Sequence, residues 1–140
     1  MGFKKEHVNT LKDALDVVTE KKKIDDRKLK RISCVVMPLV LTYEWYDMIN
    51  KYDKREEYRD DTKRYRRRFY NFIDRTECIF GDDYKKKVVA FSRAYTKPDM
   101  FWLCDVEFRT AGECLHPEWG EPKDKAHWVL HLLERVQLVD

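Results

Sequence analysis

Residues 52–59 read YDKREEYR, a charged stretch that lies between two segments with helical patterns. If residues 54–60 form a strand, side chains alternate between its two faces, so Glu57 and Arg59 share one face. A turn or bulge at the start of this strand brings Lys54 to the same side. The stretch therefore predicts a cluster of two cations and one carboxylate. Such a cluster either closes the fold as a structural ion network or forms a pocket for a nucleotide or nucleobase.

The segments that flank this stretch have clear local signals. A threonine at position 42 predicts the N-cap of a helix over residues 43–52. Thr62 predicts the N-cap of a second helix, which we expect to end at about residue 74. Residues 32–41 are β-branched and interrupted by a proline, which indicates a short strand before the first helix.

The second half of the chain has strand character. Residues 87–95 and 100–110 are rich in Val, Phe, Trp and Tyr, and a polar segment with a proline separates them, as in a hairpin or meander. Residues 112–125 contain two glycines and two prolines, which predicts a loop. The pattern of residues 127–138 fits either a strand or a helix.

Charge is distributed unevenly along the chain, although the formal net charge is only +3. Residues 1–32 and residues 51–75 each carry ten basic and six acidic side chains, whereas residues 99–140 carry four basic and nine acidic ones. An anionic ligand on one side of the protein is therefore worth testing. Residues 3–23 have the pattern of an amphipathic helix, so we expect residues 1–31 to be a helical extension with a charged linker, through which another protein could bind.

The densest basic stretch, residues 63–68, reads KRYRRR. Tyr65 belongs to an aromatic stripe with helical spacing that is expected to face the core. Arg64, Arg67 and Arg68 would then face outward together. Arginines beside aromatic side chains suit phosphate pairing and base stacking, although a solvated helix face is an equally good interpretation.

Composition excludes several protein classes. The chain has 140 residues, which fits one domain with an appendage, and 43% of them are hydrophobic, which is enough for a core. The longest apolar run, residues 34–41, is far shorter than the roughly 20 residues that a membrane span needs. No signal-peptide pattern opens the chain and no CxxC pair occurs, so we expect a cytoplasmic protein with four reduced, buried cysteines and no metal or cofactor. The alternative to four structural cysteines is a catalytic pair formed by Cys114 and His116.

The stretch YDKREEYR resembles the signature G-x-K-x-x-E-x-R of the ASCH domain family, a branch of the PUA-like β-barrels. Lys54, Glu57 and Arg59 match, and Tyr52 replaces the leading glycine. Because glycine permits a positive φ more readily than tyrosine, we expect this turn to be reshaped. The blocks at residues 91–97 and 117–120 also look like blocks of small bacterial and phage ASCH proteins.

This resemblance implies an α+β fold, in which residues 32–140 form a small PUA-like β-barrel with flanking helices. ASCH domains end in a barrel strand, so residues 127–138 are expected to be a strand. The family resemblance also implies binding of RNA or a modified nucleoside or nucleotide. Arg59 would hold a phosphate, Glu57 would accept a hydrogen bond from a base amino group, and Tyr95 or Trp119 would stack on the base. Arg64, Arg67 and Arg68 would contact the nucleic-acid backbone.

Two alternatives stay open for the function. Some ASCH relatives resemble an N4-acetylcytidine amidohydrolase, and ribonuclease activity has been proposed for others, so Lys54 and Glu57 are candidate catalytic residues, with His116 as a further acid–base candidate. Glu57 stands where that amidohydrolase has a threonine, which argues against the same mechanism. The protein could instead be a phage-type interaction protein. Asp105 and Glu107 superficially resemble a metal-dependent nuclease strand, a weaker possibility.

Overall fold

The computed structural model describes residues 34–81 and 83–136, so the extension expected over residues 1–31 lies outside the described residues. The elements in chain order are β1 (Val35–Leu41), α3 (Tyr43–Asn50), β2 (Glu56–Asp60), α4 (Lys63–Phe80), the 3₁₀ turn η1 (Tyr84–Lys86), β3 (Lys87–Arg93), β4 (Met100–Arg109), the 3₁₀ turn η2 (Pro117–Trp119) and β5 (His127–Val136).

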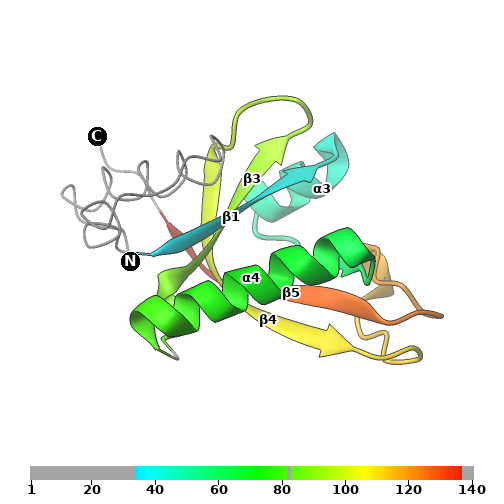
Figure 1. Ribbon diagram of the computed structural model, residues 1–140. Coiled ribbons are helices and arrows are strands. Elements are labelled where there is room, and N and C mark those ends of the chain that lie inside the picture. The colour runs from blue at the N-terminus through cyan, green and yellow to red at the C-terminus, as the bar shows by residue number, and fades with distance from the viewer. Residues whose placement is uncertain (1–33, 82, 137–140) are drawn as a thin grey trace.

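The five strands form one mixed sheet in the order β1-β3-β4-β5-β2, which curls into a half-barrel with α3 and α4 beside it (Figure 1). β1 runs parallel to β3, and the other neighbouring strands are antiparallel. β1 and β2 are therefore the two edges of the sheet. An edge position suits β1, because Pro38 has no N–H to donate to a second neighbour. The expected α+β class is confirmed, as are the two hairpin strands and the strand character of residues 127–136.

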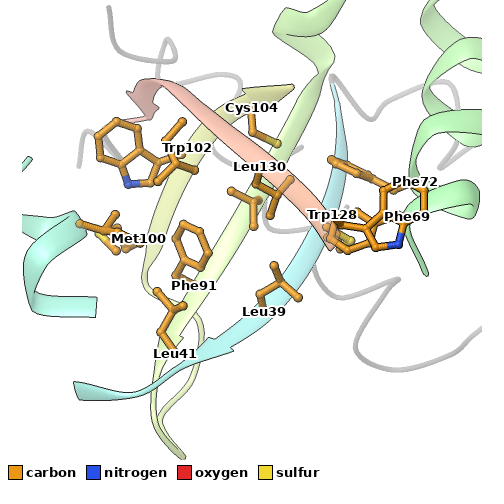
Figure 2. Close-up of a cluster of buried hydrophobic side chains, with 14 of the residues drawn as sticks. Leu39, Leu41, Phe69, Phe72, Phe91, Met100, Trp102, Cys104, Trp128 and Leu130 are labelled. Atoms are coloured by element: carbon orange, nitrogen blue, oxygen red, sulfur yellow. The ribbon is translucent and has the colours of Figure 1, made fainter. Parts of the chain in front are cut away.

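The larger of two hydrophobic clusters among the described residues packs one face of the sheet against α4 and against Tyr46 and Ile49 of α3 (Figure 2). Phe69 and Phe72 of α4 are buried there, and the Phe69 ring stacks on Trp128 of β5 with centroids 5.0 Å apart. Helix α4 ends at Phe80, whereas the sequence predicted an end near residue 74. The apolar stripe continues through Ile73 and Phe80, which also pack on the core, and this packing explains the longer helix.

The turn after α3 keeps the geometry expected for glycine although tyrosine occupies the position. Tyr52 has φ +67°, its N–H donates to Ile49 O at 3.0 Å, and the Asp53 N–H donates to Met48 O at 2.9 Å. These two bonds form a Schellman motif, which requires a left-handed residue at this place. The Tyr52 ring lies edge-on to Trp102, with centroids 5.4 Å apart. Tyr52 therefore adopts a positive φ that glycine takes more readily, and its ring packs against Trp102.

The four cysteines differ in their surroundings. Cys34 and Cys104 are buried, Cys114 is half-buried and Cys78 is exposed, so the expectation that all four are buried is wrong for the last two. Cys78 lies on the outer side of α4, where the helix meets solvent. The Cys114 thiol lies 3.5 Å from Glu121 O rather than against an imidazole. Among the described residues, no helix is both long and apolar enough to cross a bilayer.

Candidate functional site

A pocket of about 330 Å³ opens where the end of β1, the start of α3, β2 and the start of α4 meet the loop that carries η2. Lys54, Glu57, Arg59 and Trp119 all line it. Four of the residues that the sequence singled out therefore lie in one pocket. Lys54 precedes β2 and reaches Glu57 from the turn, as the turn-or-bulge hypothesis required.

Lys54 is a buried lysine that forms an ion pair with Glu57. Its side chain is 1% exposed, and its Nζ lies 3.1 Å from Glu57 Oε1 and 4.1 Å from the centroid of the Trp45 ring. Burial lowers the pKa of Lys54, because it removes water from the ammonium group, while the charge of Glu57 acts in the opposite direction. The amino group of Lys54 is thus held in the pocket between a carboxylate and an aromatic face.

Glu57 connects the two cations of the site. Its Oε1 also accepts from the Tyr58 N–H at 3.0 Å, and its Oε2 accepts from Arg59 Nη2 at 3.1 Å. Arg59 also donates to Tyr65 Oη at 3.0 Å and to Val40 O at 2.8 Å. The Arg59 Nε is buried and has no hydrogen-bond partner within the described part of the chain. Lys54, Glu57 and Arg59 together carry a net charge of +1, and the other carboxylate that lines the pocket, Asp60, is paired with Lys125 at 2.9 Å. Most lone pairs of Glu57 are already used.

Aromatic residues from four elements line the same pocket: Trp45 of α3, Tyr58 of β2, Tyr65 of α4 and Trp119 of η2. Trp119 is stacked on His116 with ring centroids 4.0 Å apart, so the His116 ring helps to fix the orientation of the indole. Tyr95, the other stacking candidate, is fully exposed and does not line the pocket. The sequence did not single out Trp45, although its place in the first turn of a helix after a strand was a usable signal. For Tyr65 the sequence left open the core and base stacking, and its side chain both packs on the core and lines the pocket.

Gly120 sets the distance between the η2 loop and helix α3. It has φ +85°, and a Cβ added there would lie 2.9 Å from Trp45 Cζ2. The loop backbone can approach the indole this closely only because the side chain is absent.

Gly120→Ala is expected to lower the free energy of unfolding by about 1–3 kcal/mol more than Gly112→Ala, because only the first adds a steric clash. Gly112 has a similar φ of +91°, but a Cβ added there would meet nothing within 4 Å, so it is a matched control for backbone strain. Urea denaturation measures both losses, and tryptophan emission reports the displacement of Trp45. Equal losses in the two variants would show that the Trp45 contact is unimportant.

The basic helix face is only partly as expected. Arg64 and Arg67 are exposed on α4. Arg68 is half-buried instead, and its guanidinium folds back against the sheet, where Nη2 donates to Pro38 O. The expectation that the three arginines face outward together is therefore wrong for Arg68, because the carbonyl of the edge strand offers it an acceptor.

A second ion network, which the sequence did not reveal, lies on the opposite face of β2. Arg109 is 3% exposed, and its Nη1 donates to Glu56 Oε1 at 2.9 Å and to Glu121 Oε2 at 2.7 Å. Tyr58 Oη donates to Glu56 Oε1 at 2.9 Å, and this bond joins the network to the pocket, which Tyr58 also lines. The alternation of Glu56 and Tyr58 with Glu57 along a strand was the available signal, but the partner of Glu56 is more than 50 residues away.

Glu121 anchors the loop that carries Trp119 to the sheet. Its Oε1 accepts from the amides of Leu115 and His116 at 2.8 and 2.9 Å, and its Oε2 lies 2.7 Å from His127 Nε2. Burial opposes ionisation, but the hydrogen bonds from Arg109, His127 and the two amides outweigh it and lower the pKa of Glu121 to about 2. The loop is therefore bound to the sheet through a buried carboxylate.

Asp105 and Glu107, the residues of the nuclease hypothesis, form no metal site with other described residues. Asp105 lies 3.8 Å from Lys87, and Glu107 is bound to Arg109 and His131. In residues 34–81 and 83–136, no group of three or more His, Cys, Asp or Glu side chains is placed to hold a metal ion. Comparison of the chain with protein-family models, curated proteins and solved structures gives no match.

Proposed function

We propose that this protein is an ASCH-type, PUA-like domain that binds RNA or a modified nucleoside or nucleotide in the pocket of Lys54, Glu57 and Arg59. The observation that carries the proposal is the combination of a positively charged floor with aromatic walls in one open pocket. Phosphates and base carbonyls are acceptors that suit the cationic floor. Bases stack on aromatic side chains, and four aromatic residues line the pocket.

The order of elements supports the family proposal. A strand, a helix and the K-x-x-E-x-R stretch follow one another, and the position of the family glycine has the positive φ that glycine adopts readily. The five-stranded half-barrel is compatible with a PUA-like barrel. Glu57 retains a lone pair on Oε2 beyond its bond to Arg59, so it can accept one hydrogen bond from a base amino group.

Trp119→Ala is expected to weaken nucleotide binding by about 1–3 kcal/mol, the usual loss when a base loses its stacking partner. The probes are cytidine, N4-acetylcytidine and uridine and cytidine monophosphates, titrated while tryptophan fluorescence is recorded. Tyr95→Ala is the matched aromatic control and is expected to leave the affinity within about twofold, because Tyr95 does not line the pocket. If no probe or short RNA changes the fluorescence of the wild type, the proposed function is wrong.

An enzyme is the second candidate, and the burial of Lys54 favours it. A lysine whose pKa is lowered by burial loses its proton more readily, and a neutral lysine can act as a general base. The test is incubation with N4-acetylcytidine and with single-stranded RNA, in which wild type is compared with Lys54→Ala. Turnover that disappears in the variant supports hydrolysis, whereas binding without turnover of either substrate supports a binding module.

A further inference from the structure

Two arginines occupy the free edge of β1. Arg59 Nη2 donates to Val40 O at 2.8 Å, and Arg68 Nη2 donates to Pro38 O. Carbonyls two residues apart on a strand point the same way, so both guanidinium groups lie along one edge, about 7 Å of strand apart. Pro38 has no N–H, and this removes a donor from the same edge.

The guanidinium groups of these two arginines lie close together without matching negative charge. Both lie against the ring of Tyr65, with Cζ 5.5 Å from the centroid for Arg59 and 5.8 Å for Arg68. Burial lowers the pKa of Arg68, and the like charges of Arg64 and Arg59 act in the same direction. Arg59 shares Glu57 with Lys54, and Arg68 has no ion pair with any of the described residues. The edge therefore has an excess of positive charge that an anion would compensate.

A separate groove of about 190 Å³, which Arg68 also lines, lies along β1 and α4. Its floor is formed by residues 35–38 of β1, and its polar groups are Arg68, Asn71 and Arg75 of α4. The pocket is lined by residues 40–42 at the other end of the same strand and by Tyr65 of the same helix. Pocket and groove thus follow one seam between β1 and α4, which run near each other in Figure 1.

The spacing of the polar groups suits a repeating anion. Arg68 and Arg75 are seven residues apart, and two helical turns place them about 10 Å apart along the helix axis. Both lie on the side of α4 that lines the groove, and Asn71 lies between them. Arg75 is exposed and forms no ion pair with the described part of the chain.

We propose that the seam between β1 and α4 is the track of a single-stranded polynucleotide, whose backbone phosphates lie on Arg68 and Arg75 while one base occupies the pocket. The inference rests on the proposed function and deepens it: the ligand is a nucleotide within a chain, and the backbone follows the groove instead of the outward face of Arg64 and Arg67.

The edge of β1 argues against an extended peptide as the occupant. A peptide that adds a strand needs free N–H and C=O groups on the sheet edge. Here Pro38 has no N–H, and arginines already occupy the carbonyls of Pro38 and Val40. Guanidinium groups, in contrast, pair with phosphates in a bidentate manner.

The test compares Arg75→Gln with Arg67→Gln, which removes the same charge from an exposed position of the same helix outside the groove. The probes are a single-stranded oligouridylate of about ten nucleotides and uridine monophosphate, followed by fluorescence over a range of salt concentrations. Arg75→Gln should weaken oligonucleotide binding about tenfold, and it should reduce the slope of log K against log salt by about 0.7, the value for one phosphate of a single strand. Arg67→Gln should weaken it no more than about twofold.

The mononucleotide separates the two proposals. Uridine monophosphate should bind wild type and Arg75→Gln equally, because it fills the pocket alone. If uridine monophosphate binds and both variants lose affinity for the oligonucleotide equally, the groove is not the track of the polynucleotide. The pocket proposal then still stands. If an acidic peptide such as oligoglutamate competes for Arg75 more strongly than the oligonucleotide, the occupant is a peptide and the inference is overturned. If neither nucleotide probe binds the wild type, the proposed function itself fails.

Discussion

Replacing Arg109 with methionine is expected to lower the free energy of unfolding by roughly 3–5 kcal/mol, the usual loss when a buried ion network loses one partner. Arg109 lies 2.9 Å from Glu56, 2.7 Å from Glu121 and 3.3 Å from Glu107. Methionine keeps much of the aliphatic volume but leaves the three carboxylates without this counter-charge. Urea denaturation at neutral pH measures the loss.

Arg93→Met is the matched control for this variant. Arg93 makes two hydrogen bonds to Asp47, at 3.0 and 3.2 Å, but both side chains are more than 40% exposed. Water and salt screen an exposed pair, so its loss should have little effect on unfolding. Equal losses for the two variants would contradict the central role assigned to the buried network.

Acid should reduce the difference in unfolding free energy between the wild type and Arg109→Met. In the wild type, the pKa of Glu121 is lowered to about 2 from an ordinary 4.5, so its stabilising contribution is complete above pH 4.5 and is lost as the pH falls toward 2. In the variant, Glu121 has lost its main cationic partner and contributes less at neutral pH. The two unfolding free energies should therefore converge below pH 4.5, and a constant difference would exclude this electrostatic origin.

Glu57→Gln is the second variant with a large expected effect. It removes the one carboxylate that Lys54 and Arg59 share, and it leaves a buried ammonium with an uncompensated charge. Breaking a buried pair in this way should lower the free energy of unfolding by about 3–5 kcal/mol. Thermal and urea unfolding, carried out in low salt and without nucleotide, measure this loss of unfolding free energy.

The double variant Lys54→Met, Glu57→Gln tests the reason for that loss. With the buried ammonium gone, most of the lost stability should return, because replacing both partners of a buried pair is often nearly neutral. The coupling free energy from the double-mutant cycle then measures the interaction between Lys54 and Glu57. Nucleotide binding should be weaker in the double variant than in the wild type, since the Lys54 ammonium and the Glu57 carboxylate are both absent. Wild-type affinity in the double variant would assign the pair a structural role alone.

The local elements could be predicted from sequence because their signals are short-range. The Thr62 cap, which accepts from the Tyr65 N–H, the proline of the edge strand and the alternation around Glu57 each act within a few residues. Thr42 occupies the N-cap position of α3, but its side chain makes no capping hydrogen bond. The alternation put Glu57 and Arg59 on one face, a turn before the strand was needed to bring in Lys54, and the structure places all three around one pocket. These are the parts of the fold and site for which neighbouring residues carry the information.

The rest depends on partners that are distant in sequence. Arg109 meets Glu56 across 53 residues, and Arg68 leaves the solvent because Pro38, 30 residues earlier, offers a carbonyl. Tyr52 adopts a conformation typical of glycine beside Trp102, which comes 50 residues later. Periodicity and spacing within a segment carry no information on such long-range contacts. The second ion network and the orientation of the Arg68 side chain could therefore be seen only in the three-dimensional structure.

The bonds of Glu121 have a kinetic consequence for the pocket. Because a buried carboxylate holds the amides of Leu115 and His116, the segment that presents Trp119 is ordered before any ligand arrives. A ligand then loses little affinity to the entropy of ordering a wall, and its association needs no slow closing step. Differences in affinity between ligands of this pocket should accordingly reside in how long each stays bound.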